Sequence, residues 1–238
     1  YTSFFEYDSF GRLRFIKDSD SNVLNEYEYN YRGLSQNPNF VKSITYKKPS
    51  TEGSIDVTNP LDAIIEITFL DGIGRPIQQK AHKQSASGKD IVTPIVYDSF
   101  GRQTREYLPY VTQGANLNFE SNMLQSVVAY YNQPQYDFTL QPYSEQMIEA
   151  SPLNRISKQS APGNSWDTDS DTMQKFEYQT NTDSEVALFK AQTVWSSNLE
   201  IYTSTLVRDG YFLPNQLFKT ILKNENWKVQ DGLNNTSE

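Results

Sequence analysis

The only histidine of this chain, His82, is the first candidate for catalysis, and it stands between Ala81 and Lys83. A Ser-His-Asp arrangement would have to be built on this one residue, and no nucleophile-elbow sequence accompanies it. The chain has no cysteine, which excludes cysteine nucleophiles, thiolate zinc sites and disulfides. A zinc site would therefore need carboxylates for every protein ligand other than His82. We predict that His82 has an ordinary position in a strand, and that the chain is not an enzyme and has no catalytic residue.

Two runs, 18–22 and 167–171, place acidic or amide side chains at every second position, as the start of a calcium-binding loop does. Such a loop also needs a glycine at its sixth position and a bidentate glutamate at its twelfth. Valine and tyrosine stand at these positions in the first run, and threonine and tyrosine in the second. We predict acidic hairpin turns and no metal site, with a weak calcium site as the alternative.

Other patterns that could support chemistry are weak in this sequence. Gly72-x-Gly74 is not followed by a third glycine, and Pro76 blocks the helix that a dinucleotide-binding loop must open. A pair of carboxylates for glycoside cleavage cannot be singled out among the 29 acidic residues. Aromatic side chains on a sheet face can stack on sugars, although rings at strand spacing are more often part of a core. We predict no cofactor, and we keep glycan binding as an alternative.

The elements that would position any site are marked by an internal repeat. The hexapeptide Tyr-Asp-Ser-Phe-Gly-Arg occurs without change at 7–12 and 97–102, and a degraded copy, Leu-Asp-Gly-Ile-Gly-Arg, occupies 70–75. We interpret Ser-Pro-Leu-Asn-Arg at 151–155 as a fourth, worn copy with asparagine in the position of the glycine. The residues assigned to the structural repeat motif are Tyr7, Asp8, Phe10, Gly11, Arg12, Asp71, Gly74, Arg75, Tyr97, Asp98, Phe100, Gly101 and Arg102.

The hexapeptide predicts a tight turn between two strands. Asp8 can accept hydrogen bonds from backbone N–H groups two or more residues further on. Gly11 is expected to supply a positive φ, where another residue would cost roughly 1–2 kcal/mol. Arg12 can pair with a carboxylate such as Asp8, and we expect the rings of Tyr7 and Phe10 to pack on the sheet. The motif is therefore a device for forming hairpins.

The composition favours strands, because aromatic and β-branched side chains fit a pleated, half-buried surface. The chain has 16 tyrosines and 13 phenylalanines. Alternation in 23–31 places Tyr27, Tyr29 and Tyr31 on one face of a strand. Segments with the pattern of strands are 2–7, 13–17, 23–31, 41–47, 64–70, 76–83, 91–97, 103–108, 173–178, 186–196, 201–208 and 216–222.

The strand pattern breaks in the middle of the chain. Apolar residues at helical spacing predict a helix over 119–131, capped by Asn116 or Asn118, and a second short helix over 144–149. The predicted organisation is a hairpin unit at 1–32, an irregular linker at 33–62, a β-rich domain at 63–230 with a helical insertion near 117–150, and a polar tail at 231–238.

Charge and hydropathy exclude several kinds of partner. The net charge is −8, and such a chain repels nucleic-acid phosphates and anionic lipid. No apolar run is long enough to cross a bilayer, and no secretory signal stands at the N-terminus. We expect no nucleic-acid partner and no membrane span, and we expect the chain to be a piece of a longer protein that continues beyond Glu238.

The repeats resemble the YD (tyrosine-aspartate) repeats of RHS proteins. The strings that carry the resemblance are Tyr-Asp-Ser-Phe-Gly-Arg at 7–12 and 97–102, and Asp-Gly-Ile-Gly-Arg-Pro-Ile-Gln at 71–78. Together with Glu-Tyr-Leu-Pro at 106–109 and the turn at 151–155, they resemble a module of unassigned function at the front of RHS proteins of the Bacteroidota. The resemblance covers roughly residues 1–230.

This resemblance implies YD-repeat antiparallel β-hairpins that form part of an RHS-like β-shell, which in relatives encloses a toxin or other cargo. It further implies a secreted or cell-surface protein of a Gram-negative bacterium, with type IX secretion as a route and other repeats of the longer chain as partners. The autoproteolytic core of RHS relatives has no counterpart here. We expect a structural scaffold, with a surface adhesin or glycan-binding module as the alternative.

Overall fold

The computed structural model describes residues 2–30, 37–166, 172–227 and 236–237. These residues fall into two compact units, the first made of Tyr1–Glu145 and Ala161–Asp167, and the second of Gln146–Ser160 and Thr168–Glu238. The strands of both units pair in the antiparallel sense, and the expectation of a mainly β protein is confirmed. Each unit is described by itself below.

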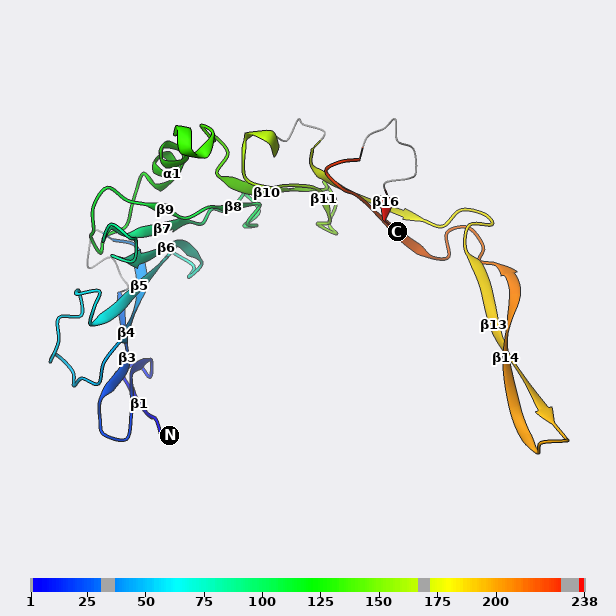
Figure 1. The fold of residues 1–238 in the computed structure, drawn as a ribbon, viewed down its shortest axis with the longest axis horizontal. Helices are drawn as coiled ribbons and strands as arrows, with labels where there is room; N and C mark the ends of the chain where they lie inside the picture. Colours follow the sequence, from blue (N-terminus) through cyan, green and yellow to red (C-terminus); the bar gives the residue numbers. More distant parts are fainter. Residues whose placement is uncertain (1, 31–36, 167–171, 228–235, 238) are drawn as a thin grey trace. The chain divides into compact units, whose positions relative to one another are not determined.

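Unit 1 is built on an eight-stranded sheet in which nearly every strand pairs with its neighbour in sequence (Figure 1). Its order is β1-β2-β3-β4-β5-β6-β7-β9. The segment 33–62, which the sequence marks as an irregular linker, therefore contributes a strand to the middle of the sheet. The strands are β1 (Phe4–Tyr7), β2 (Leu13–Lys17), β3 (Val23–Asn30), β4 (Asn39–Tyr46), β5 (Ala63–Leu70), β6 (Pro76–His82), β7 (Ile91–Pro94) and β9 (Tyr110–Val111).

One face of this sheet carries the core of unit 1. Along β5 the side chains alternate, so that Ala63, Ile65, Ile67 and Phe69 are buried. This period of two is what a strand with one covered face requires. The ring of Phe119, from a loop that crosses the face, packs edge-on against Phe69 with centroids 5.4 Å apart.

The segment predicted as a helical insertion contains one α-helix, α1 (Met123–Tyr131), and a short 3₁₀ turn, η1 (Pro134–Tyr136). The helix begins later than predicted, because residues 116–120 form a loop bonded to the sheet. Its N-cap is Asn122, which makes no side-chain cap hydrogen bond, so the predicted caps are wrong. The predicted second helix over 144–149 is also wrong: β10 (Tyr143–Ile148) is a strand that pairs with β8 (Arg105–Tyr107).

Unit 2 contains β11 (Ile156–Ser160), β12 (Gln174–Thr180), β15 (Phe218–Lys223) and β16 (Thr236–Ser237), paired in the order β16-β15-β12-β11. Between β12 and β15 the chain leaves this sheet as a separate two-stranded ribbon, β13 (Ala187–Ser196) and β14 (Ile201–Tyr211), which Figure 1 shows as two long paired arrows. Most side chains of the ribbon are exposed. Buried Asn181 ties the base of the ribbon, since its amide accepts the N–H groups of Gln216 and Leu217 and donates to the Leu213 carbonyl.

Candidate functional site

The two copies of the hexapeptide form the same five-residue turn, which we call the clamp turn. In the first copy, Asp8 Oδ1 accepts the backbone N–H groups of Phe10 and Arg12, each at 2.9 Å, and Asp8 Oδ2 accepts Arg12 Nε–H at 2.7 Å. Gly11 has a φ of +75°, the positive value that the turn requires. The hydrogen bond from the Arg12 side chain is the largest cause that lowers the pKa of Asp8.

The turns at 71–75 and 98–102 repeat this geometry. Asp71 and Asp98 each accept two backbone N–H groups on Oδ1 and an arginine Nε–H on Oδ2. Hydrogen bonds from the backbone N–H groups of Arg75 and Arg102 are the largest cause of the lowered pKa of these aspartates. The two turns also touch each other, because a Cβ added at Gly101 would lie 2.9 Å from Arg75 Nη1.

Three further turns share the hydrogen bond from the fourth N–H to the first carbonyl and the positive φ of the fourth residue, with other side chains. At 18–22, Asp18 Oδ1 accepts the N–H groups of Asp20 and Asn22, and Ser21 takes the positive φ of 66°. Asp18 Oδ2 accepts the side-chain amide N–H of Asn22 at 2.9 Å, so both oxygens of Asp18 are engaged inside the turn, as the hairpin interpretation requires. The turn 85–89 uses a serine hydroxyl in place of the aspartate, and at 151–155 Asn154 has a φ of +51°. The second acidic run, 167–171, lies outside the described residues.

Three arginines at the ends of these turns each lie over a tyrosine further along the chain. The guanidinium carbon is 4.4 Å from the ring centroid for Arg12 on Tyr29, 4.3 Å for Arg75 on Tyr97 and 4.4 Å for Arg155 on Tyr178. In every case the tyrosine hydroxyl also donates to the carbonyl of the residue directly after the arginine, at 2.8, 2.9 and 3.0 Å. We call this arrangement the Arg–Tyr link. Each link joins the start of the strand that follows the turn to a tyrosine on the next strand or just after it, and so fixes the register of the pair.

The rings within the hexapeptide do not all pack as the sequence suggests. Phe10 and Phe100 stand at the tips of their turns with 72% and 81% of their surface exposed. Tyr97 is half-buried by its Arg–Tyr link, whereas Tyr7 is 62% exposed. The expectation that Tyr7 and Phe10 pack on the sheet is therefore wrong: Phe10 lies at the tip of its turn, as Phe100 does, and no described residue covers Tyr7 at the edge of β1. Tyr31 lies outside the described residues.

A group of buried polar side chains lies on β6, where Gln78, Lys80 and His82 point to the core face at every second position. Lys80 is 1% exposed, and its Nζ donates to the carbonyl of Asn118 and to both the carbonyl and the side-chain oxygen of Asn116, the last two at 3.3 and 3.2 Å. Two carboxylates also face it, Glu120 Oε1 at 3.4 Å and Asp90 Oδ2 at 3.7 Å. A buried ammonium requires such compensation.

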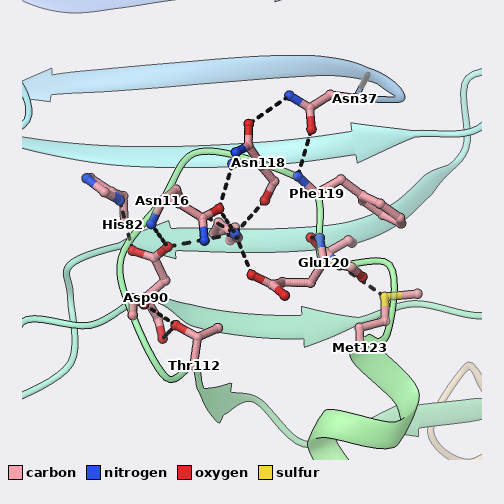
Figure 2. Close-up of polar contacts among 12 residues, drawn as sticks. Asn37, His82, Asp90, Thr112, Asn116, Asn118, Phe119, Glu120 and Met123 are labelled. Atoms are coloured by element: carbon pink, nitrogen blue, oxygen red, sulfur yellow. Dashed lines mark hydrogen bonds and ion pairs between the residues drawn. The ribbon is translucent and has the colours of Figure 1, made fainter. Parts of the chain in front are cut away.

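Asp90, which has no exposed surface, completes the group. Its Oδ1 lies 2.8 Å from His82 Nδ1 and accepts the N–H of Lys83, and its Oδ2 accepts the N–H of Asn116. Figure 2 shows Asp90 between His82 and Asn116. We call Gln78, Lys80, His82 and Asp90 the polar cluster. His82 is in a strand, as predicted, and its neighbour Asp90 holds it there.

The polar cluster binds one loop, residues 112–120, to the sheet. Gln78 exchanges two hydrogen bonds with the backbone of Glu120 at 3.1 Å, so the loop is held along its length by backbone contacts. Sequence reasoning missed Gln78, Lys80 and Asp90. The available signal was the alternation of Gln78, Lys80 and His82 along a strand whose paired strand, β5, has apolar residues at the opposite positions.

A depression of about 340 Å³ lies beside this loop and α1, lined among others by Tyr110, Glu120, Tyr130 and Gln133. Burial raises the pKa of the Tyr110 hydroxyl to about 12. Within the ranges that the structure describes, no three His, Cys, Asp or Glu side chains are grouped to hold a metal. No helix in those ranges is long and apolar enough to span a membrane.

Fold and contacts together define a mainly β protein with repeated hairpin turns, in which the polar cluster is bonded to a loop of the same chain. The family described as a domain of unknown function (DUF6443) matches residues 42–180, which is more than half of the chain. The chain belongs to this family. The matched range contains the polar cluster and the clamp turns at 71–75 and 98–102. No curated protein matches the chain.

Proposed function

We propose that this chain is a structural segment of an RHS-type, YD-repeat protein, in which hairpins are added one after another to form a wall. The observation that carries the proposal is the Arg–Tyr link, which recurs three times with the same two contacts. Because the same two contacts recur with nearly equal distances, we interpret the link as a structural contact that sets the spacing of the strands. The polar cluster supports the same conclusion, because its charged groups bind a loop of the chain itself.

Replacement of Lys80 tests whether the polar cluster is structural or is a site that performs chemistry. We expect Lys80→Ala to destabilise unit 1 by about 3–5 kcal/mol, because Asp90 and three loop acceptors lose their buried cation. Limited proteolysis followed by mass spectrometry should then show cleavage within 112–120. The matched control is Lys48→Ala, since Lys48 forms a half-exposed ion pair with Asp62 that contributes less than about 1 kcal/mol. Unchanged stability and protease resistance in Lys80→Ala would contradict the scaffold.

The resemblance of the repeats to those of RHS proteins also supports the wider part of the proposal. The longer protein is exported to the medium or to the surface of a Gram-negative cell, by type IX secretion, and the segment encloses or presents other domains. Fractionation of cells that produce the full-length protein, with protease added to intact cells, tests this. Recovery of the protein only from the cytoplasm would contradict it.

A second candidate function, glycan binding, rests on the ribbon of unit 2. Trp195 and Tyr202 pair across its strands with ring centroids 4.9 Å apart and with 51% and 71% of their surface exposed. Exposed rings of this kind can stack on sugars. A glycan array should show binding that Trp195→Ala abolishes and that Phe218→Ala, at another exposed ring, leaves unchanged. An array without binding removes this candidate.

A further inference from the structure

Lys80 and Asn116 place an amine against an amide inside unit 1. Lys80 Nζ lies 3.2 Å from Asn116 Oδ1, and the Lys80 side chain has no exposed surface. An amine that has lost its proton is a nucleophile, and a lysine kept away from water is suited to this role. Reacting groups that lie about 3–3.5 Å apart are close to an attack geometry. The contact is therefore a starting geometry for transfer of the Asn116 acyl group to Lys80.

The groups around this contact meet the other requirements of such a reaction. The backbone N–H of Asn118 donates to Asn116 Oδ1 at 2.9 Å, so a donor already faces the oxygen on which negative charge would develop (Figure 2). Asp90 Oδ2 lies 3.7 Å from Lys80 Nζ, and Glu120 Oε1 lies 3.4 Å from it. Because charges are costly to bury, these carboxylates are suited to accept the ammonium proton. Asn116 itself is exposed, which leaves a path for a small leaving group.

We propose that Lys80 and Asn116 form an isopeptide bond, a covalent cross-link between β6 and the loop of residues 112–120. Asp90 takes one proton from the Lys80 ammonium, and the neutral Nζ attacks Cγ of Asn116. Asp90 gives that proton to Nδ2 as the Cγ–Nδ2 bond breaks, and it takes the second proton that Nζ loses. Ammonia leaves and carries this last proton into the solvent as ammonium. One amide replaces another, so the reaction needs no oxidant, reductant or co-reactant.

The cross-link adds a covalent tie where hydrogen bonds already hold the loop. The contacts of the Lys80 ammonium described above are those of the chain before the bond forms. A cross-link between β6 and the loop restricts the unfolded chain, as a disulfide does, and this sequence contains no cysteine from which a disulfide could be made. The inference goes beyond the proposed function, because the bond is a property of this chain in whatever larger protein carries it.

Mass spectrometry of the purified chain, intact and after digestion with trypsin, tests the proposal. We expect an intact mass lower by one ammonia, and a branched peptide in which the sequence around Lys80 is joined to the sequence around Asn116. Asn116→Ala should remove the branched peptide. The matched control is Asn118→Ala, which removes a neighbouring side-chain amide but keeps the backbone N–H and carbonyl that face Asn116 and Lys80, so the branched peptide should remain. Thermal unfolding checks that the variants are folded.

The branched peptide decides the question, because an asparagine that cyclises on its own backbone also loses ammonia. Recovery of Lys80 and Asn116 only in separate linear peptides of the folded, unaltered chain would overturn the proposal, even where Asn116→Ala does not fold. A branched peptide formed with loss of water would also overturn it, since the bond would then lie on a carboxylate. Linear peptides combined with the loss of stability expected for Lys80→Ala would reject the cross-link and keep the scaffold.

Discussion

The hexapeptides at 7–12 and 97–102 have identical sequences and identical clamp turns, and they differ only in their surroundings. At 97–102, Tyr97 holds Arg75 of another turn, and the same Arg75 lies against Gly101. At 7–12, Tyr7 is exposed and open space surrounds Gly11. The comparison shows that the turn is local, made by Asp, Gly and Arg alone, whereas the contribution of the tyrosine depends on a neighbour.

The largest difference in stability loss between the two copies is expected when their glycines are replaced. Gly11→Ala and Gly101→Ala both place a Cβ at a positive φ, which costs roughly 1–2 kcal/mol. At Gly101 the Cβ would also displace the guanidinium of Arg75 from its place over Tyr97, so this variant should lose more stability. Chemical denaturation measures both. Equal losses would show that the contact between the two turns contributes nothing.

A smaller difference is expected from the tyrosines. Tyr97→Phe removes the hydrogen bond to the Pro76 carbonyl, and we expect it to lower the free energy of unfolding by about 1 kcal/mol. Tyr7→Phe in the chain of 238 residues should have no measurable effect, because its hydroxyl is bonded to no described residue. A loss at Tyr7 as large as at Tyr97 would contradict the Arg–Tyr link as the source of the difference.

The smallest difference is expected in the response to acid. The pKa values of Asp8 and Asp98 are lowered by folding, so each carboxylate stabilises the fold above its unfolded pKa near 3.8, and this contribution is lost as pH falls through the lower folded value. Glu149, with its pKa lowered to about 2 chiefly by Arg155, adds a loss between about pH 4.5 and 2.

Asp8→Asn and Asp98→Asn should reduce this acid sensitivity by the same amount, because each aspartate bonds only within its own turn. Melting temperatures between pH 5 and 2 test the pair of variants. An acid response that changes in one variant only would show that the turn is not local.

The sequence was sufficient to predict the contacts between residues that are only a few positions apart. The pairing of Asp8 with Arg12, the positive φ of Gly11 and the left-handed Asn154 all follow from short-range geometry. The polar cluster was not predictable in this way, because Lys80 and its acceptor Asn118 are 38 residues apart. The same contact explains the wrong helix caps, since Asn116 and Asn118 are occupied by Lys80.

The strand at 143–148 was missed for a related reason. Apolar and polar residues at 144–149 fit a helix in isolation, and only the pairing with β8 makes the segment a strand. The exposure of Tyr7 depends on which strand lies at the edge of the sheet, and a repeat motif read by itself does not contain that information.

The sequential order of the sheet in unit 1 also has a consequence for folding kinetics. Each strand from β1 to β7 pairs with the next one in the chain, so most hairpins close with a short loop, the connection 47–62 between β4 and β5 being the exception. Growth of the sheet can therefore begin at any clamp turn and spread in both directions, as in other proteins with nearest-neighbour contacts. The bonds from the polar cluster to residues 116–120 span far longer loops. We expect them to form last, with the desolvation of Lys80 as the slow step that completes the unit.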